Sequence, residues 1–255
     1  MGFWAKLAAA GGIGLLSMNA AHAADITVIS STAMRELLDE LIPAFERASG
    51  HKVTIDFQSG VNVSAKLRGG AAADLVVTTA TALDELIKDE KVVAGSRIDF
   101  VRSRVGVAVR AGAPKPDIST PEAFKATLLA AKSIGVSKGP SGQHLLRVIE
   151  RLGIADQVKP KMVVPELGVR VGALVARGAA EIGVKQINEL LPIAGIDFVG
   201  PLPDALQTVL VYSTGLAATG KQQETTKELV KFLTSDAAIP VMKKLGQDPA
   251  REART

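Results

Sequence analysis

Residues 26–57 read ITVISSTAMRELLDELIPAFERASGHKVTIDF, and this stretch decides the fold. The β-branched run 26–29 predicts a strand that ends in a polar turn. Apolar residues then recur at spacings of three and four over residues 33–48, which predicts an amphipathic helix that Gly50 ends. Residues 52–57 predict a second strand. A strand, a helix and a strand joined by short turns are typical of an α/β fold.

The same alternation continues outward to the C-terminus, without an internal repeat or a low-complexity segment. We expect further strands at residues 74–77, 104–110, 133–136, 161–164, 182–184, 197–199 and 207–212. We expect further helices at residues 61–68, 80–88, 121–130, 141–152, 169–176, 224–232 and 236–244. The polar tail from Gly246 onward is expected to fray.

The N-terminal residues 1–24 read MGFWAKLAAAGGIGLLSMNAAHAA. Lys6 supplies a positive charge, residues 7–18 form an apolar run, and Ala21-His22-Ala23 places small side chains at alternate positions. This order predicts a cleavable secretory signal peptide over residues 1–24 and a mature protein in a bacterial periplasm. A membrane anchor is the weaker interpretation, because about 20 apolar residues are needed to cross a bilayer.

Composition narrows the class of protein. The sequence has no Cys, so disulfides and thiolate metal sites are excluded. Without Lys6, 29 of the 30 basic residues remain against 26 acidic ones, a net charge of +3 that is dispersed along the chain. This balance favours neither nucleic acid nor a membrane surface as a partner, and it is compatible with a small anionic ligand.

Polar turns follow several of the predicted strands and lead into helices. They are Ser30-Ser31-Thr32, Ser59-Gly60-Val61-Asn62, Thr78-Thr79 and Gly139-Pro140-Ser141-Gly142. Ser and Thr commonly cap helices, which is the simpler interpretation. However, helix N-termini also bind anions, and in a parallel sheet these turns meet at the carboxyl ends of the strands. The sequence therefore predicts an anion site built from several turns.

Residues 26–87 resemble the N-terminal lobe of the molybdate-binding proteins of ABC importers, which are periplasmic solute-binding proteins. The clearest motifs are Phe57 to Ser59 and GAAADL at residues 70–75, and residues 172–175 and 181–184 follow in family order. The resemblance implies a type II, clamshell binding protein with two lobes, each a mixed sheet flanked by helices. It places lobe 1 at residues 25–104 plus 210–255 and lobe 2 at residues 105–209.

The resemblance also implies a function, namely a monomeric substrate-binding component of an ABC importer. Such a protein captures a molybdate-like oxyanion between its lobes and delivers it to a permease in the inner membrane. Carried onto this sequence, the resemblance gives Ser31, Thr32 and Ser59 as ligand-binding residues. Ser141 falls where the family contributes a backbone amide.

Two positions depart from the family pattern. Gln186 stands where the family has a ligand-binding Tyr, and Arg170 stands near a neutral backbone amide of the family. Arg170 and Lys185 could be solvated, as most basic side chains are. Alternatively, Arg170 could form a bidentate pair with a carboxylate or another planar anion, which suits its guanidinium fork. The alternative ligand is therefore an organic carboxylate.

Catalytic motifs are absent from the sequence. It contains no Gly-x-Ser-x-Gly, no His-Glu-x-x-His and no phosphate-binding loop, and its His residues lack metal-ligand spacing. We therefore expect a binding protein that is not an enzyme and that needs neither a cofactor nor a metal. An exported enzyme and a sensory domain on the same scaffold are the remaining hypotheses.

Overall fold

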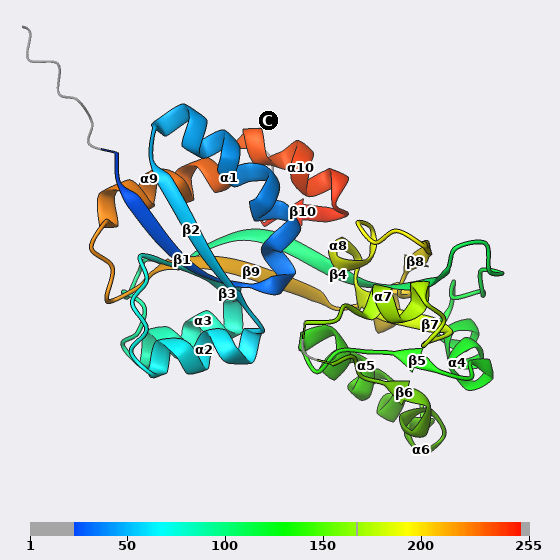
Figure 1. Ribbon diagram of the computed structural model, residues 1–255. Coiled ribbons are helices and arrows are strands. Elements are labelled where there is room, and N and C mark those ends of the chain that lie inside the picture. Colours follow the sequence, from blue (N-terminus) through cyan, green and yellow to red (C-terminus); the bar gives the residue numbers. More distant parts are fainter. Residues whose placement is uncertain (1–22, 167, 251–255) are drawn as a thin grey trace, which may run out of the picture.

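The computed structural model describes residues 23–166 and 168–250. Almost all of the predicted signal peptide, residues 1–22, therefore lies outside the described residues. Helices and strands alternate along the chain, so the predicted α/β class is confirmed (Figure 1). No helix within the described ranges combines the length and the apolar character that crossing a bilayer requires.

The strands are β1 (Asp25–Ser31), β2 (Lys52–Gln58), β3 (Leu75–Thr79), β4 (Ile98–Arg110), β5 (Ile134–Gly135), β6 (Met162–Val163), β7 (Ile182–Gln186), β8 (Ile196–Pro201), β9 (Val209–Leu216) and β10 (Gln247–Pro249). The α-helices are α1 (Arg35–Ser49), α2 (Gly60–Arg68), α3 (Ala80–Lys88), α4 (Pro121–Ala130), α5 (Pro140–Arg151), α6 (Ala155–Val158), α7 (Val171–Ala176), α8 (Ile187–Leu190), α9 (Gln223–Leu233) and α10 (Ile239–Lys244). Short 3-10 turns cover Thr32–Met34, Lys159–Lys161, Asp204–Leu206 and Asp236–Ala238.

The long strand β4 joins two bodies, which Figure 1 shows side by side. Its residues 98–104 pair with β9, and its residues 105–110 pair with β7 and β8. We call the body around β1, β2, β3, β9 and β10 lobe 1, and the body around β5, β6, β7 and β8 lobe 2. The sheet order is β2-β1-β3-β9-β4-β7-β5-β6, with β8 and β10 also pairing with β4.

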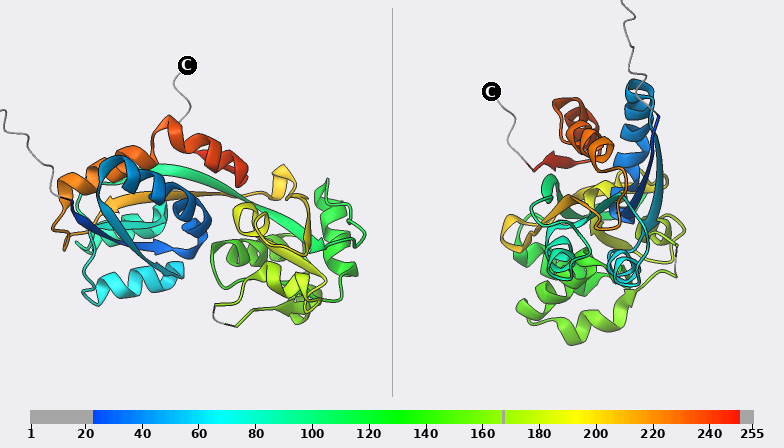
Figure 2. Two further views of the ribbon diagram at one scale, coloured as in Figure 1. Left: turned by 45° about the horizontal axis from the view of Figure 1, so that its top comes forward. Right: turned by 90° about the vertical axis from the view of Figure 1, so that its left-hand side faces the viewer.

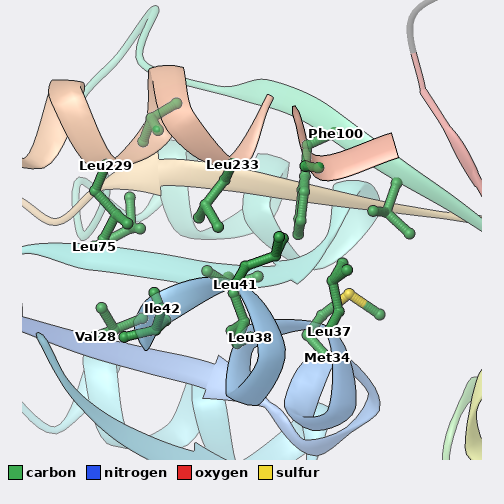
Figure 3. Close-up of a cluster of buried hydrophobic side chains, with 14 of the residues drawn as sticks. Val28, Met34, Leu37, Leu38, Leu41, Ile42, Leu75, Phe100, Leu229 and Leu233 are labelled. Atoms are coloured by element: carbon green, nitrogen blue, oxygen red, sulfur yellow. The ribbon is translucent and has the colours of Figure 1, made fainter. Parts of the chain in front are cut away.

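Lobe 1 has helices on both faces of its sheet. One face packs against α1, α9 and α10, and the other packs against α2 and α3 (Figures 1 and 2). The apolar stripe of α1 explains its position, because Leu37, Leu38, Leu41 and Ile42 are buried against the sheet together with Leu229 and Leu233 of α9 (Figure 3). Burying each such side chain contributes about 1.5–3 kcal/mol.

Lobe 2 repeats this layering on a smaller scale. The valines of β4 and β7 pack on one face of its sheet against Phe124 and Leu128 of α4 and against Leu145 and Ile149 of α5. The short helix α7 lies on the other face, where Leu174 and Val175 form a separate small cluster.

The strand directions bring the polar turns of the two lobes to one place. In lobe 1, β1 runs parallel to β2 and β3, so their carboxyl ends share one edge of the sheet. In lobe 2, β5 runs parallel to β6 and β7. The end of β7 at Gln186 pairs with Val105, beside the point where β4 leaves lobe 1.

Two expectations about the elements were wrong. Strand β4 begins at Ile98 rather than at residue 104. Charged residues such as Asp99 and Arg102 interrupt the apolar pattern by which a strand is predicted. The tail does not simply fray from Gly246, because β10 pairs antiparallel with residues 101–103 of β4. A ladder of backbone hydrogen bonds needs no apolar side chains, so a polar tail can form it.

Candidate functional site

An ion pair joins the two lobes. Glu36 lies in the first turn of α1 in lobe 1, and Arg170 precedes α7 in lobe 2. Nη2 of Arg170 lies 2.5 Å from Oε1 of Glu36. The Glu36 side chain is only 12% exposed, whereas the Arg170 side chain is 41% exposed. The contact therefore places a nearly buried carboxylate of one lobe against a cation of the other.

A second ion pair lies in lobe 2, at the end of β7. Nζ of Lys185 lies 2.9 Å from Oε2 of Glu189, and both side chains are nearly buried, at 13% and 15% exposed. Lys185 also donates to Oγ of Ser137 at 3.2 Å. Ser137 Oγ in turn lies 3.4 Å from Oγ of Ser141, which is fully buried at the start of α5. This chain of contacts links the end of β7 to the turn after β5.

A buried hydrogen bond connects β7 to lobe 1. The Gln186 amide donates from Nε2 to the Tyr212 hydroxyl at 2.7 Å. Burial, reinforced by the negative charge of Glu189, raises the pKa of the Tyr212 phenol well above its usual range, although hydrogen bonds with Gln186 and Ser31 oppose the shift. Ser31 therefore lies beside this phenol, and its own Oγ accepts from the backbone of Ala33.

We call these residues the inter-lobe cluster. It consists of Ser31, Glu36, Ser137, Ser141, Arg170, Lys185, Gln186, Glu189 and Tyr212. Within it, burial raises the pKa of Glu36 above the ordinary range of a glutamate. The positive charge of Arg170 lowers this pKa, while the negative charge of Glu189 raises it further. Because its pKa is raised overall, the Glu36 carboxyl binds and releases a proton at a pH closer to neutral than an exposed glutamate does.

Several polar atoms near the carboxyl ends of the strands lack hydrogen-bond partners. Gln186 is fully buried, and its Oε1 accepts no hydrogen bond. The Oγ of Thr78, near the end of β3, is also buried and unpartnered. An unpaired buried polar atom costs about 1–3 kcal/mol. Such atoms are expected where a ligand or water supplies the missing partner.

The residues predicted from sequence fall into two groups. Ser31, Ser141, Arg170 and Gln186 belong to the inter-lobe cluster. Ser59 is exposed, and its Oγ caps α2 by accepting from Asn62 at 3.3 Å. Thr32 is exposed in the 3-10 turn before α1. Among the described residues, no side-chain hydrogen bond links Ser59 or Thr32 to the cluster.

Sequence reasoning did not select Glu36, Ser137, Glu189 and Tyr212 as site residues. Glu36 looks like an acidic residue that favours a helix N-terminus, which is the usual role of such a residue. Tyr212 lies in a strand and looked like a packing residue. The one feature of the sequence that indicated this part of the site was the position of Lys185 and Gln186 directly after a predicted strand.

A hollow of about 540 Å³ lies in lobe 2 between α4 and the sheet. Alanine and proline side chains such as Ala113, Pro114 and Ala126 line it, and its charged residues are Asp117 and Glu181. It offers no cation, so it does not suit an anion. Elsewhere in the described ranges, His, Asp and Glu side chains form no group that could hold a metal ion.

Comparison with known proteins identifies the family of this chain and several similar proteins. A family model described as bacterial extracellular solute-binding protein matches residues 26–247. An aconitate isomerase of Pseudomonas sp is 35% identical over 232 residues, covering 88% of this chain and 87% of its own. The molybdate-binding protein ModA of Azotobacter vinelandii is 26% identical over 251 residues, covering 94% of this chain and 96% of its own.

The fold also matches a solved structure. The periplasmic molybdate-binding protein of Azotobacter vinelandii superimposes with a TM-score of 0.75 at 18% identity, over 89% of this chain and 100% of that chain. The match confirms the type II binding-protein fold predicted from the sequence. The matches to the family model and to ModA confirm the resemblance to molybdate-binding proteins.

One prediction is overturned by these comparisons. The sequence led us to expect a protein that is not an enzyme, but a relative 35% identical over most of the chain is an isomerase. Motif searches missed this because they cover nucleophilic, metal-dependent and phosphate-binding sites. A reaction that only moves a proton needs none of these motifs.

Proposed function

This chain belongs to the bacterial extracellular solute-binding protein family, and from that premise we propose that it binds a small polycarboxylate between its lobes and isomerises it. The substrate that we propose is aconitate, which it converts between the cis and trans forms. The relative at 35% identity supports this substrate over molybdate, which is bound by a relative at 26% identity. The proposal therefore adopts the organic carboxylate that the sequence offered as an alternative ligand.

The observation that carries the proposal is the pairing of two cations with two carboxylates in the inter-lobe cluster. Arg170 pairs with Glu36, and Lys185 pairs with Glu189. Each cation already pairs with a nearly buried carboxylate, so a carboxylate of a ligand can take the same place. A guanidinium binds a planar carboxylate through two parallel hydrogen bonds.

Hydroxyl groups complete the proposed binding site. Ser31 lies at the end of β1, Ser137 and Ser141 follow β5, and Thr78 adds a buried hydroxyl without a hydrogen-bond partner. These groups can donate to carboxylate oxygens without adding charge. A tricarboxylate would then meet two cations and several neutral hydrogen-bond donors.

Proton nuclear magnetic resonance tests the reaction directly. We expect the purified protein to convert cis-aconitate into trans-aconitate, and the reverse, whereas heat-denatured protein does not. Replacing Arg170 with Ala removes a charged hydrogen-bond partner, worth about 1.5–3 kcal/mol, and should raise KM about 10- to 100-fold. Tight calorimetric binding of molybdate, with no conversion of either aconitate isomer, would overturn the proposal.

The cellular location is also a proposal. The family is extracellular, and the N-terminal pattern supports export to the periplasm through a cleaved signal peptide. N-terminal sequencing of the protein from a periplasmic fraction should give a chain that begins near Ala24 and lacks the signal peptide. Recovery of the full-length chain from the cytoplasm would contradict export. The permease partner implied by the resemblance stays a prediction.

A further inference from the structure

We infer that Glu36 is the group that moves the proton in the isomerisation, and that Arg170 holds it until a carboxylate of the substrate takes its place. This inference rests on the proposed function, because it assigns the chemistry of the same site. No motif in the sequence and no comparison assigns a role to Glu36. The evidence is its position, its burial and its partner in the opposite lobe.

Interconversion of the two aconitate isomers can proceed by moving one proton across three carbons. A carboxylate removes a proton from the methylene carbon, and the electron pair of the broken C–H bond spreads over the allylic carbons and the attached carboxylates. The carboxyl group then returns a proton to the opposite allylic carbon, where a new C–H bond forms while the double bond shifts. While the carboxyl group holds this proton, the proton can exchange with solvent. The product has the same composition as the substrate, so no oxidant, reductant or further reactant is required.

Such a step needs one base that faces the substrate and can be released from its own partner. Glu36 fits, because its side chain is only 12% exposed and its partner is a single cation, which a carboxylate of the substrate can bind instead. Its charged partner is Arg170, which belongs to the opposite lobe. The group therefore lies between the lobes, where the proposed substrate binds, rather than inside the core of either lobe.

The other titratable groups of the inter-lobe cluster fit the role less well. Glu189 is paired with Lys185, four residues before it on the same segment. Lys185 is engaged by both Glu189 and Ser137. The Tyr212 phenol is fully buried and has a strongly raised pKa, so it would not ionise to act as a base.

The ion pair with Arg170 suggests how the base is released. Arg170 can hold a carboxylate of the substrate through both arms of its guanidinium, and in doing so it would displace Glu36. Glu36 would then lose the positive charge that lowers its pKa, while burial and the negative charge of Glu189 would still raise it. Binding of the substrate would thus make Glu36 a stronger base beside the methylene group.

Replacement of Glu36 by Gln separates binding from chemistry. Gln keeps the size of the side chain but cannot accept a proton, so we expect the rate of aconitate isomerisation to fall about 100- to 10,000-fold. Calorimetry should show that this variant binds trans-aconitate within about tenfold of the wild type. Glu40→Gln is the matched control, since Glu40 lies on the exposed face of the same helix and pairs with Lys244, and it should keep full activity.

Deuterium labelling gives a second measurement that a purely structural role would not change. In heavy water, the wild type should incorporate solvent deuterium into bound aconitate, and Glu36→Gln should not. Glu36→Asp should recover part of both the exchange and the isomerisation. Isomerisation by Glu36→Gln at half the wild-type rate or more would overturn the role of Glu36 and leave the proposed function intact. A wild type that isomerises neither form would overturn both.

Discussion

Asn188 of α8 donates its side-chain amide to the backbone carbonyl of Ala33, 155 residues earlier in the chain, at 2.6 Å. The side-chain oxygen of Asn188 accepts from Ser103 of β4 at 2.7 Å. One buried side chain therefore joins the turn after β1 in lobe 1, the strand that crosses between the lobes, and the helix after β7 in lobe 2. This bridge fixes the position of Ser31 and Glu36 relative to Glu189.

Replacing Asn188 with Ala should therefore destabilise the protein. The substitution leaves the Ala33 carbonyl and the Ser103 hydroxyl buried without partners, and we expect the free energy of unfolding to fall by about 2–3 kcal/mol. Urea denaturation measures this change. Asn62→Ala is a matched control, because Asn62 is exposed and should change the stability by no more than about 0.5 kcal/mol. Equal effects of the two variants would contradict the bridging role.

Glu36 should make the stability depend on pH. Burial raises its pKa, so the fold favours its protonated form, and the stability that this provides is fully present below about pH 4.3. It is lost as pH rises through the raised pKa. Glu36→Gln mimics the protonated form at every pH, so its melting temperature should exceed that of the wild type at pH 8 and approach it near pH 4.

Arg170 and Glu189 are the charged groups that act on the Glu36 carboxyl in this comparison, and Lys185 pairs with Glu189. Glu40→Gln serves as the control again, since it should show no such pH-dependent gain over the wild type. A lower melting temperature for Glu36→Gln than for the wild type at pH 8 would show that the ion pair with Arg170 outweighs the cost of burial.

Asp74 should have the opposite pH dependence. Burial would raise its pKa, but the backbone and hydroxyl of Thr27 and the amides of Gln222 and Lys221 donate to its carboxylate and together lower the pKa. The stability that these bonds provide is present above the unfolded pKa of about 3.9 and is lost as pH falls through the lowered value.

Replacing Asp74 with Ala should accordingly cost about 3 kcal/mol of unfolding free energy at pH 7, because several hydrogen bonds to a charged group are lost. Denaturation at a series of pH values should show the cost shrinking toward pH 2. Asp39→Ala, at an exposed position of α1, should be nearly neutral throughout. A cost for Asp74→Ala that does not change with pH would contradict the lowered pKa.

Much of the fold could be predicted from the sequence because the patterns are local. The apolar spacing that buries Leu37, Leu38 and Leu41 is visible in eight consecutive residues, and Gly50 marks the end of α1 with a left-handed backbone. The strands β5 and β6 have only two residues each, and their expected ranges were longer. Tertiary pairing, which local patterns do not show, decides where such short strands begin and end.

The candidate site was predictable only where the topology brings the turns together. Ser31 and Ser141 lie in polar turns after strands, so the rule that parallel strands share a carboxyl edge indicated them, whereas Gln186 was indicated by the family resemblance. Glu36 and Tyr212 become part of the site through contacts between distant segments. The partner of Glu36 lies 134 residues away, at Arg170, and no pattern within α1 indicates that pairing.

Two glycines in the first turns of helices offer a paired prediction. At Gly142, in the first turn of α5, an added Cβ would lie 1.7 Å from the carbonyl oxygen of Ser137, so the turn must move. At Gly60, the first residue of α2, an added Cβ would meet nothing within 4 Å. Both glycines lie in the first turn of a helix, but only Gly142 lies against Ser137, whose hydroxyl accepts a hydrogen bond from Lys185.

Gly142→Ala should therefore lower the free energy of unfolding by about 3 kcal/mol, as expected for overpacking against fixed backbone. It should also weaken binding of trans-aconitate. Ser137 would shift, and its hydrogen bond with Lys185 would be lost or displaced. Gly60→Ala should instead raise the stability by about 0.5 kcal/mol, since Ala restricts the unfolded chain. Urea denaturation and calorimetry on both variants test the pair, and a Gly142→Ala variant as stable as Gly60→Ala would show that the turn after β5 is not fixed as described.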